Sequence, residues 1–189
     1  MDEAHRSVLL RIAREAIRAD LAGEPPPPLE GVPADFPPYG GAFVSLHNRG
    51  ALRGCIGTFY PDEPLPATIQ KIAVESAHDP RFIGRPVRLA ELPDIDIEIS
   101  VLSEPVRTTD PLSLELGKHG IYIRRGLLGG CFLPQVATEH PAWTKEEFLT
   151  RCCRDKAGLP PDAWRDPDTE VLLFTAEVFG EGKARQAAG

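Results

Sequence analysis

The sequence predicts an α+β fold, with a largely antiparallel sheet and flanking helices, from two observations. Helical and strand-like segments are interspersed along the 189 residues, and two of the segments read as β-hairpins, whose strands run antiparallel. Hydrophobic residues make up 42% of the chain and charged residues 26%, as in ordinary globular proteins. The length suits a single domain over residues 1–189, with a structured core over about 5–182.

The chain begins with a predicted helix and a proline-rich connector. Apolar residues recur at helical spacing over residues 3–22, with arginines on the opposite face. Residues 24–41 contain seven prolines. Because proline fixes φ and removes a backbone donor, this segment is predicted to be an extended surface connector.

A hairpin and a helix follow. Residues 41–57 are predicted to form a β-hairpin that turns at the sequence HNRG. Since strand side chains alternate, Arg53 and Cys55 share one face of its second strand and Gly54 lies on the other. Residues 66–78 are predicted to be a helix, which ends where an Asp-Pro pair follows.

The second part of the chain continues the mixture of strands and helices. Isoleucines alternate with acidic residues in DIDIEISV, which is typical of a strand with one buried face. The helix TKEEFLTRCCRDKAG opens with a capping-box pattern and closes on glycine. The elements expected here are a strand over 94–101, two short strands within 120–134, a helix over 144–158 and a last strand over 169–179.

Charge and composition exclude several classes of protein. The net charge is −7 and the arginines are scattered, so nucleic-acid binding is not favoured, although a local basic patch is left open. No apolar run is long enough to span a bilayer, and the N-terminus does not resemble a signal peptide. The expected compartment is therefore the cytoplasm.

No cofactor or metal is expected. The four cysteines include no C-x-x-C pair, and the chain has neither a G-x-G-x-x-G nor a Walker A motif. Cys152 and Cys153 are adjacent, which does not suit tetrahedral zinc, and they recur with Phe148 and Leu149 at helical spacing. Both are predicted to be packing residues.

The hexapeptide LRGCIG places Cys55 between two glycines, with Arg53 on the same strand face. A nucleophilic cysteine needs access and a positive neighbour, and glycine lets a ligand approach the backbone closely. The alternative is that Cys55 is a small buried hydrophobe and that a glycine marks a bulge. The residues alone leave both interpretations open.

Several other polar residues could carry chemistry. His119 stands at the start of a predicted strand, where it could titrate or close a local turn. Asp79 and Arg81, in DPRF, could form a local ion pair, while Arg81 could also bind a carboxylate or phosphate. Gln135 could bond a ligand or close a backbone turn, and His78 is assigned to the end of a helix.

Six segments in this order, LRGCIG, DPRF, IEISVLSE, GKHGI, LPQVA and KAGLPPDAW, resemble the AMMECR family, protein A of the AmmeMemoRadiSam system. The resemblance covers nearly the whole chain. It implies a compact α+β fold of two unequal subdomains with a cleft between them, and an intracellular protein. The system's name implies association with a Memo-type protein and a radical S-adenosylmethionine (SAM) protein.

Two hypotheses about function follow. In the first, the chain is a cysteine-dependent enzyme or enzyme component in a modification pathway, with transferase or hydrolase-type chemistry. In the second, it is a binding or adaptor module whose LRGCIG pocket holds a peptide or nucleic acid. For the first, the expected catalytic residues are Cys55 and His119, and the expected substrate-binding residues are Arg53, Gly54, Asp79, Arg81 and Gln135. We further expect the face with Arg53 and Cys55 to open on a cleft.

Overall fold

The structure is a computed structural model that describes residues 1–182. The chain divides into a first unit, residues 1–101 and 177–182, and a second unit, residues 102–176. Each unit contains a four-stranded sheet with helices beside it, so the predicted α+β class is confirmed. Among the described residues, no helix is both long enough and apolar enough to cross a membrane.

The first unit follows the predicted elements closely. From α1 to β3, each boundary lies within two residues of its expected position, and the hairpin turns at Arg49 and Gly50 as HNRG predicts. Asp2 caps the first helix by accepting a hydrogen bond from the amide of His5 at 2.8 Å. The elements are α1 (Glu3–Leu21), β1 (Gly41–Asn48), β2 (Ala51–Phe59), α2 (Leu65–Ala77), β3 (Ile95–Leu102) and β8 (Ala176–Gly180).

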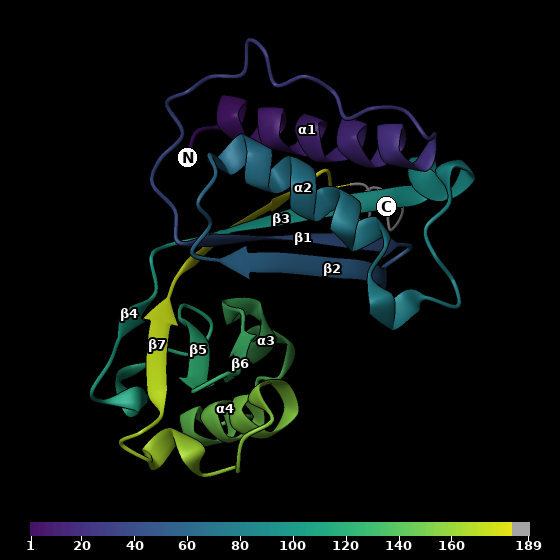
Figure 1. Cartoon of the computed structure of the whole chain (residues 1–189). Helices are drawn as coiled ribbons and strands as arrows, with labels where there is room; N and C mark the ends of the chain where they lie inside the picture. The colour runs from purple at the N-terminus through teal and green to yellow at the C-terminus, as the bar shows by residue number, and fades with distance from the viewer. Residues whose placement is uncertain (183–189) are drawn as a thin grey trace. The chain divides into compact units, whose positions relative to one another are not determined.

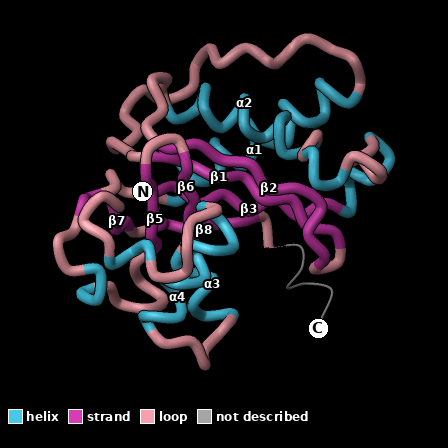
Figure 2. The backbone as a smooth tube through the Cα atoms, turned by 60° about the horizontal axis from the view of Figure 1, so that its bottom comes forward, coloured by secondary structure: helices cyan, strands magenta, loops and turns pink. Residues whose placement is uncertain are grey.

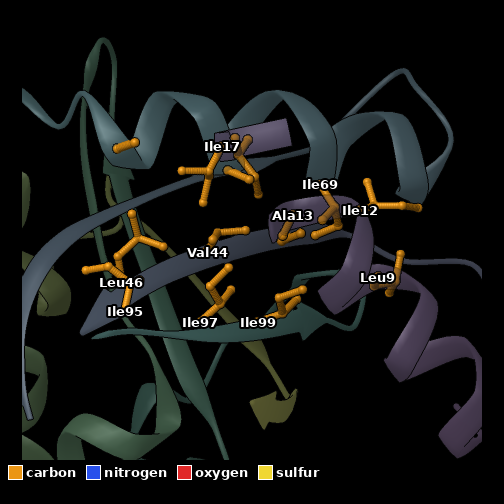
Figure 3. Close-up of a cluster of buried hydrophobic side chains, with 14 of the residues drawn as sticks. Leu9, Ile12, Ala13, Ile17, Val44, Leu46, Ile69, Ile95, Ile97 and Ile99 are labelled. Carbon is orange, nitrogen blue, oxygen red and sulfur yellow. The ribbon is translucent and has the colours of Figure 1, made fainter. Parts of the chain in front are cut away.

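Helices α1 and α2 lie together on one face of the sheet β2-β1-β3-β8, as Figures 1 and 2 show. Ile17 of α1 and Ile69 of α2 meet Val44 and Ile97 of the sheet in a core without solvent exposure (Figure 3). The alternation predicted for DIDIEISV is confirmed as far as Ile99. Beyond it the prediction fails, because Ser100 and Val101 are both buried. In this order β2 is an edge strand, which leaves one side of its backbone without a neighbouring strand.

The second unit is built on the sheet β4-β7-β5-β6, in which every neighbouring pair runs antiparallel. Phe148, Cys152 and Cys153 are fully buried in its core, as predicted. Thr144 forms the predicted capping box, and Gly158 adopts φ 65° after a π-helical turn. Its elements are β4 (Val106–Arg107), β5 (Gly120–Arg125), β6 (Leu128–Phe132), α3 (Pro134–Glu139), α4 (Lys145–Cys152) and β7 (Glu170–Phe174).

The last predicted strand, residues 169–179, is two strands. β7 ends at Phe174 and β8 begins at Ala176, and the two belong to different sheets. Between the two strands, the backbone of Thr175 is held by Ser103. The Ser103 amide donates to the Thr175 carbonyl oxygen at 2.9 Å, and the Thr175 amide donates to the Ser103 hydroxyl at 3.0 Å. A continuous apolar pattern reports burial and does not report which sheet a strand joins. The sequence also did not predict the short elements α3 and β4.

Candidate functional site

The LRGCIG segment lies on β2, and Cys55 stands on this edge strand opposite Ser45 of β1. The Ser45 hydroxyl donates to the sulfur of Cys55 at 3.2 Å. The Cys55 side chain is partly exposed, and it is not in a disulfide. Cys55 is therefore a partly exposed residue whose free thiol accepts a hydrogen bond from a hydroxyl.

Gly54 is needed for the end of helix α2 to pack against β2. A Cβ atom at Gly54 would lie 1.9 Å from the carbonyl oxygen of Ser76, which is too close for any side chain at this position. The Ser76 hydroxyl also accepts from the amide of Ile56 at 3.1 Å and lies 2.9 Å from the carbonyl oxygen of Val44. The helix end is thereby held across the two strands of the hairpin.

The DPRF segment clasps the backbone of Cys55. The Cys55 amide donates to Asp79 Oδ2 at 2.9 Å, and Arg81 Nη2 donates to the Cys55 carbonyl oxygen at 2.8 Å. Asp79 also caps the short 3₁₀ helix Pro80–Phe82 by accepting from the amide of Arg81 at 3.0 Å. Both polar groups of Cys55 thus find partners on the side of β2 that has no neighbouring strand. We call Asp79 and Arg81 the Asp79–Arg81 clasp.

The clasp joins a buried carboxylate to a solvent-accessible guanidinium. Asp79 is 3% exposed, whereas the side chain of Arg81 is 53% exposed. Burial opposes ionisation of Asp79, but its hydrogen bonds from the Arg81 guanidinium and from the amides of Cys55 and Arg81 outweigh burial and lower its pKa to about 2. The pKa of Arg81 is raised, first by Asp79 and to a smaller extent by Cys55. Arg81 is therefore a permanent cation next to Cys55.

Arg53 has a different set of partners. Its Nε donates to Glu91 Oε1 at 2.7 Å and its Nη1 to the carbonyl oxygen of Arg85 at 3.0 Å. Asn48 donates to the same Glu91 oxygen at 3.0 Å. The bond from Arg53, with that from Asn48, lowers the pKa of Glu91 to about 2 against the effect of burial. Arg53 thus fastens residues 85–91 to the start of β2, two residues before Cys55 in the chain.

His119 and Gln135 belong to the second unit. The Nδ1 atom of His119 accepts from the amide of Glu115 at 3.0 Å, so its Nε2 carries the proton of the neutral ring. This bond closes the turn before β5. Gln135 lies in the first turn of α3, where its backbone carbonyl accepts a hydrogen bond from the Thr138 hydroxyl at 2.7 Å. The other five predicted site residues, Arg53, Gly54, Cys55, Asp79 and Arg81, come together in the first unit.

Sequence reasoning missed Ser45, Ser76 and Glu91. A regular hairpin with its turn at Arg49 and Gly50 would place Ser45 opposite Gly54. An irregularity between Leu46 and His47 shifts the register by one residue and brings Ser45 opposite Cys55. HNRG marks the turn but carries no signal for this shift.

The chain is similar to proteins of archaea along nearly its whole length. The family model AMMECR1 matches residues 10–179. A protein of Methanothermobacter thermautotrophicus is 43% identical over 181 residues, which cover 92% of each chain. A protein of Methanosarcina acetivorans is 37% identical, over 96% of this chain and 94% of its own. The crystal structure of uncharacterized protein PH0010 from Pyrococcus horikoshii matches with a TM-score of 0.87 and 39% identity, covering 98% and 95% of the two chains.

Proposed function

Because the chain belongs to the AMMECR1 family and holds a partly exposed thiol beside a cation, we propose that it is a cysteine-dependent enzyme or enzyme component. Cys55 is its nucleophile or covalent anchor. The observation that carries the proposal is the bond from Arg81 to the backbone carbonyl of Cys55, since it holds a guanidinium beside this residue. Reactive cysteines need access together with a positive neighbour, and buried cysteines lack the access.

Each neighbour has a role in this proposal. Ser45 donates a hydrogen bond to the sulfur of Cys55, and Arg81 places a positive charge beside the same residue. The Asp79 carboxylate alone would oppose a thiolate, but its charge is balanced by Arg81, which it also orients. The exposed part of Arg81 holds an anionic group of the substrate. Arg53 acts indirectly, by fixing residues 85–91 beside the strand.

For the second unit, we propose His119 as the base or thiolate partner and Gln135 as a substrate contact. His119 has an Nε2 proton to donate while its Nδ1 is held by Glu115. Replacing His119 with glutamine tests this role. The substitution should slow any turnover and leave the alkylation of Cys55 intact if the histidine acts on the substrate.

The partners and the compartment are part of the same proposal. A Memo-type protein and a radical SAM protein are the proposed associates, and co-purification from a native host tests them. The four cysteines form no disulfide within the described residues, which supports a reducing compartment such as the cytoplasm.

The decisive experiment is to look for a covalent adduct. The chain would be purified from a native host without thiol reagents, and its Cys55 peptide analysed by mass spectrometry. We expect a mass increase on Cys55 that is absent from Cys152. If the thiol is always unmodified, and Cys55→Ala supports growth as well as the native protein in a host that requires the gene, the non-catalytic adaptor for a peptide or nucleic acid becomes the better account.

A further inference from the structure

Two segments of this acidic chain contain no acidic residue at all. They are residues 36–61 and 80–90, whereas the whole protein carries a net charge of −7. The second segment is rich in arginine, with Arg81, Arg85 and Arg88 among its residues. The acids that flank it, Asp79 and Glu91, are already bonded to arginine. The two segments therefore contribute only positive charge to a protein whose net charge is −7.

Three arginines in these segments are available for a partner. Arg49, Arg85 and Arg88 are exposed, and none of their side chains has a carboxylate partner among residues 1–182. We call these three residues the arginine face. Elsewhere in the first unit, arginines such as Arg6 and Arg14 bond to glutamates.

The arginine face is held together by bonds between its two segments. Arg53 donates to the carbonyl oxygen of Arg85 at 3.0 Å, and Asn48, which precedes Arg49, donates to Glu91 at 3.0 Å. In Figure 1 the teal segment between α2 and β3 passes the end of the sheet at which β1 turns into β2. The hairpin turn and residues 85–91 thus lie side by side within the first unit.

Apolar side chains stand among these arginines. Ile83 is 86% exposed and Leu89 is 44% exposed, and both lie in the same segment as Arg85 and Arg88. Leu52, three residues after Arg49, is 39% exposed. Exposed apolar groups surrounded by one sign of charge are typical of a surface that binds another protein.

We infer that the arginine face, with Ile83 and Leu89, docks an acidic segment of a partner protein that also carries aliphatic side chains. Charge complementarity selects glutamate and aspartate, and the exposed isoleucine and leucine select the aliphatic groups. A nucleic acid would instead use aromatic platforms for its bases. The one exposed large aromatic residue of the described chain, Tyr60, follows the far end of β2. Docking does not depend on the thiol chemistry proposed for Cys55.

Fluorescence anisotropy with three labelled probes of equal charge tests this inference. The probes are a glutamate-rich peptide interrupted by leucines, poly-glutamate, and single-stranded oligothymidine. The native chain should bind the leucine-containing peptide most tightly, and added salt should weaken binding. The double substitution Arg85→Glu and Arg88→Glu should weaken it by about tenfold or more, since two charge contacts are reversed.

Arg11→Glu with Lys71→Glu is the matched control, because it makes the same charge change at exposed sites on α1 and α2. This variant should keep most of the affinity, while Ile83→Ser should lower affinity for the leucine-containing peptide and not for poly-glutamate. Circular dichroism confirms folding, and an unchanged Cys55 alkylation rate separates docking from the proposed chemistry. Equal losses in both double variants, or tightest binding of oligothymidine, would overturn the inference.

Discussion

The same dipeptide, Gly-Cys, occurs on a strand of each unit with different surroundings. Gly54 packs against the end of α2, and Gly130 packs against the π-helical turn after α4, where a Cβ would lie 2.3 Å from the carbonyl carbon of Lys156. Cys55 then meets a hydroxyl and a guanidinium. Cys131 instead lies opposite Tyr122 and follows Gly130, whose carbonyl is 3.6 Å from the buried sulfur of Cys152.

This comparison separates packing from chemistry. In both strands the glycine is required by a helix end that approaches the sheet, so glycine beside cysteine does not by itself mark a ligand site. What sets Cys55 apart is the Asp79–Arg81 clasp, which bonds to its backbone from the 3₁₀ helix after α2. For the function proposed above, the charged motif is therefore the informative signal, whereas packing alone explains the glycine.

The largest expected effect is that of Gly54→Ala. A methyl group 1.9 Å from the Ser76 carbonyl oxygen must displace the end of α2, so we expect a loss of about 3 kcal/mol in the free energy of unfolding. Gly130→Ala should have a loss of similar size. Urea denaturation measures both, and Gly84→Ala, which would meet no atom within 4 Å, is the control and should be nearly neutral. A neutral Gly54→Ala would show that the glycine is not needed for packing.

Asp79→Asn should have the second largest effect on stability. The substitution removes a buried charge and replaces one of the two acceptor oxygens with an NH2 donor, so the remaining oxygen cannot serve Arg81 and the Cys55 amide as the carboxylate does. We expect a cost of about 2 kcal/mol at neutral pH, since Arg81 remains partly hydrated. Because the folded pKa of Asp79 is lowered to about 2, its stabilisation is present above pH about 4 and is lost as the pH falls towards 2. The variant should therefore lose less stability than the native chain over that range.

Asp155→Asn is the control for this prediction, because it breaks an exposed pair with Arg154 in the second unit. It should leave the stability nearly unchanged, because an exposed ion pair contributes little. Denaturation curves recorded between about pH 5 and about pH 2 distinguish Asp79→Asn from Asp155→Asn, because this range brackets the pKa of an aspartate in the unfolded chain. Parallel acid losses in the native chain and in Asp79→Asn would mean that other carboxylates control acid stability.

Cys152→Ser should cost about 1–2 kcal/mol. The pKa of Cys152 is raised, mainly by burial, so its thiol is neutral in the core that it shares with Phe148. A hydroxyl in its place brings a more polar group into the same apolar site. Thermal unfolding measures the loss, and the alkylation rate of Cys55 should not change. A Cys152→Ser variant with native stability but altered Cys55 reactivity would contradict the packing role.

The sequence predicts helices and strands well, but it predicts the contacts between them less well. The period of two in DIDIEISV and the capping box at Thr144 are local signals, and both are confirmed. The contact of Cys55 with Asp79 joins residues 24 apart in the chain. It depends on the length of α2 and on how far the Gly54 contact lets its end approach the sheet, which no local pattern encodes. The bond from Arg53 to Glu91 spans 38 residues and was missed for the same reason.

The smallest expected effect gives the most direct test of the central claim, that Arg81 supports a reactive thiolate at Cys55. The measurement is the rate of Cys55 alkylation by iodoacetamide in the folded chain, resolved by mass spectrometry. Arg81→Gln should slow it by about fivefold, which corresponds to about 1 kcal/mol, while Arg53→Gln, whose guanidinium is bound to Glu91, should change it less. Labelling of Cys55 only after denaturation, or an unchanged rate in Arg81→Gln, would contradict the claim.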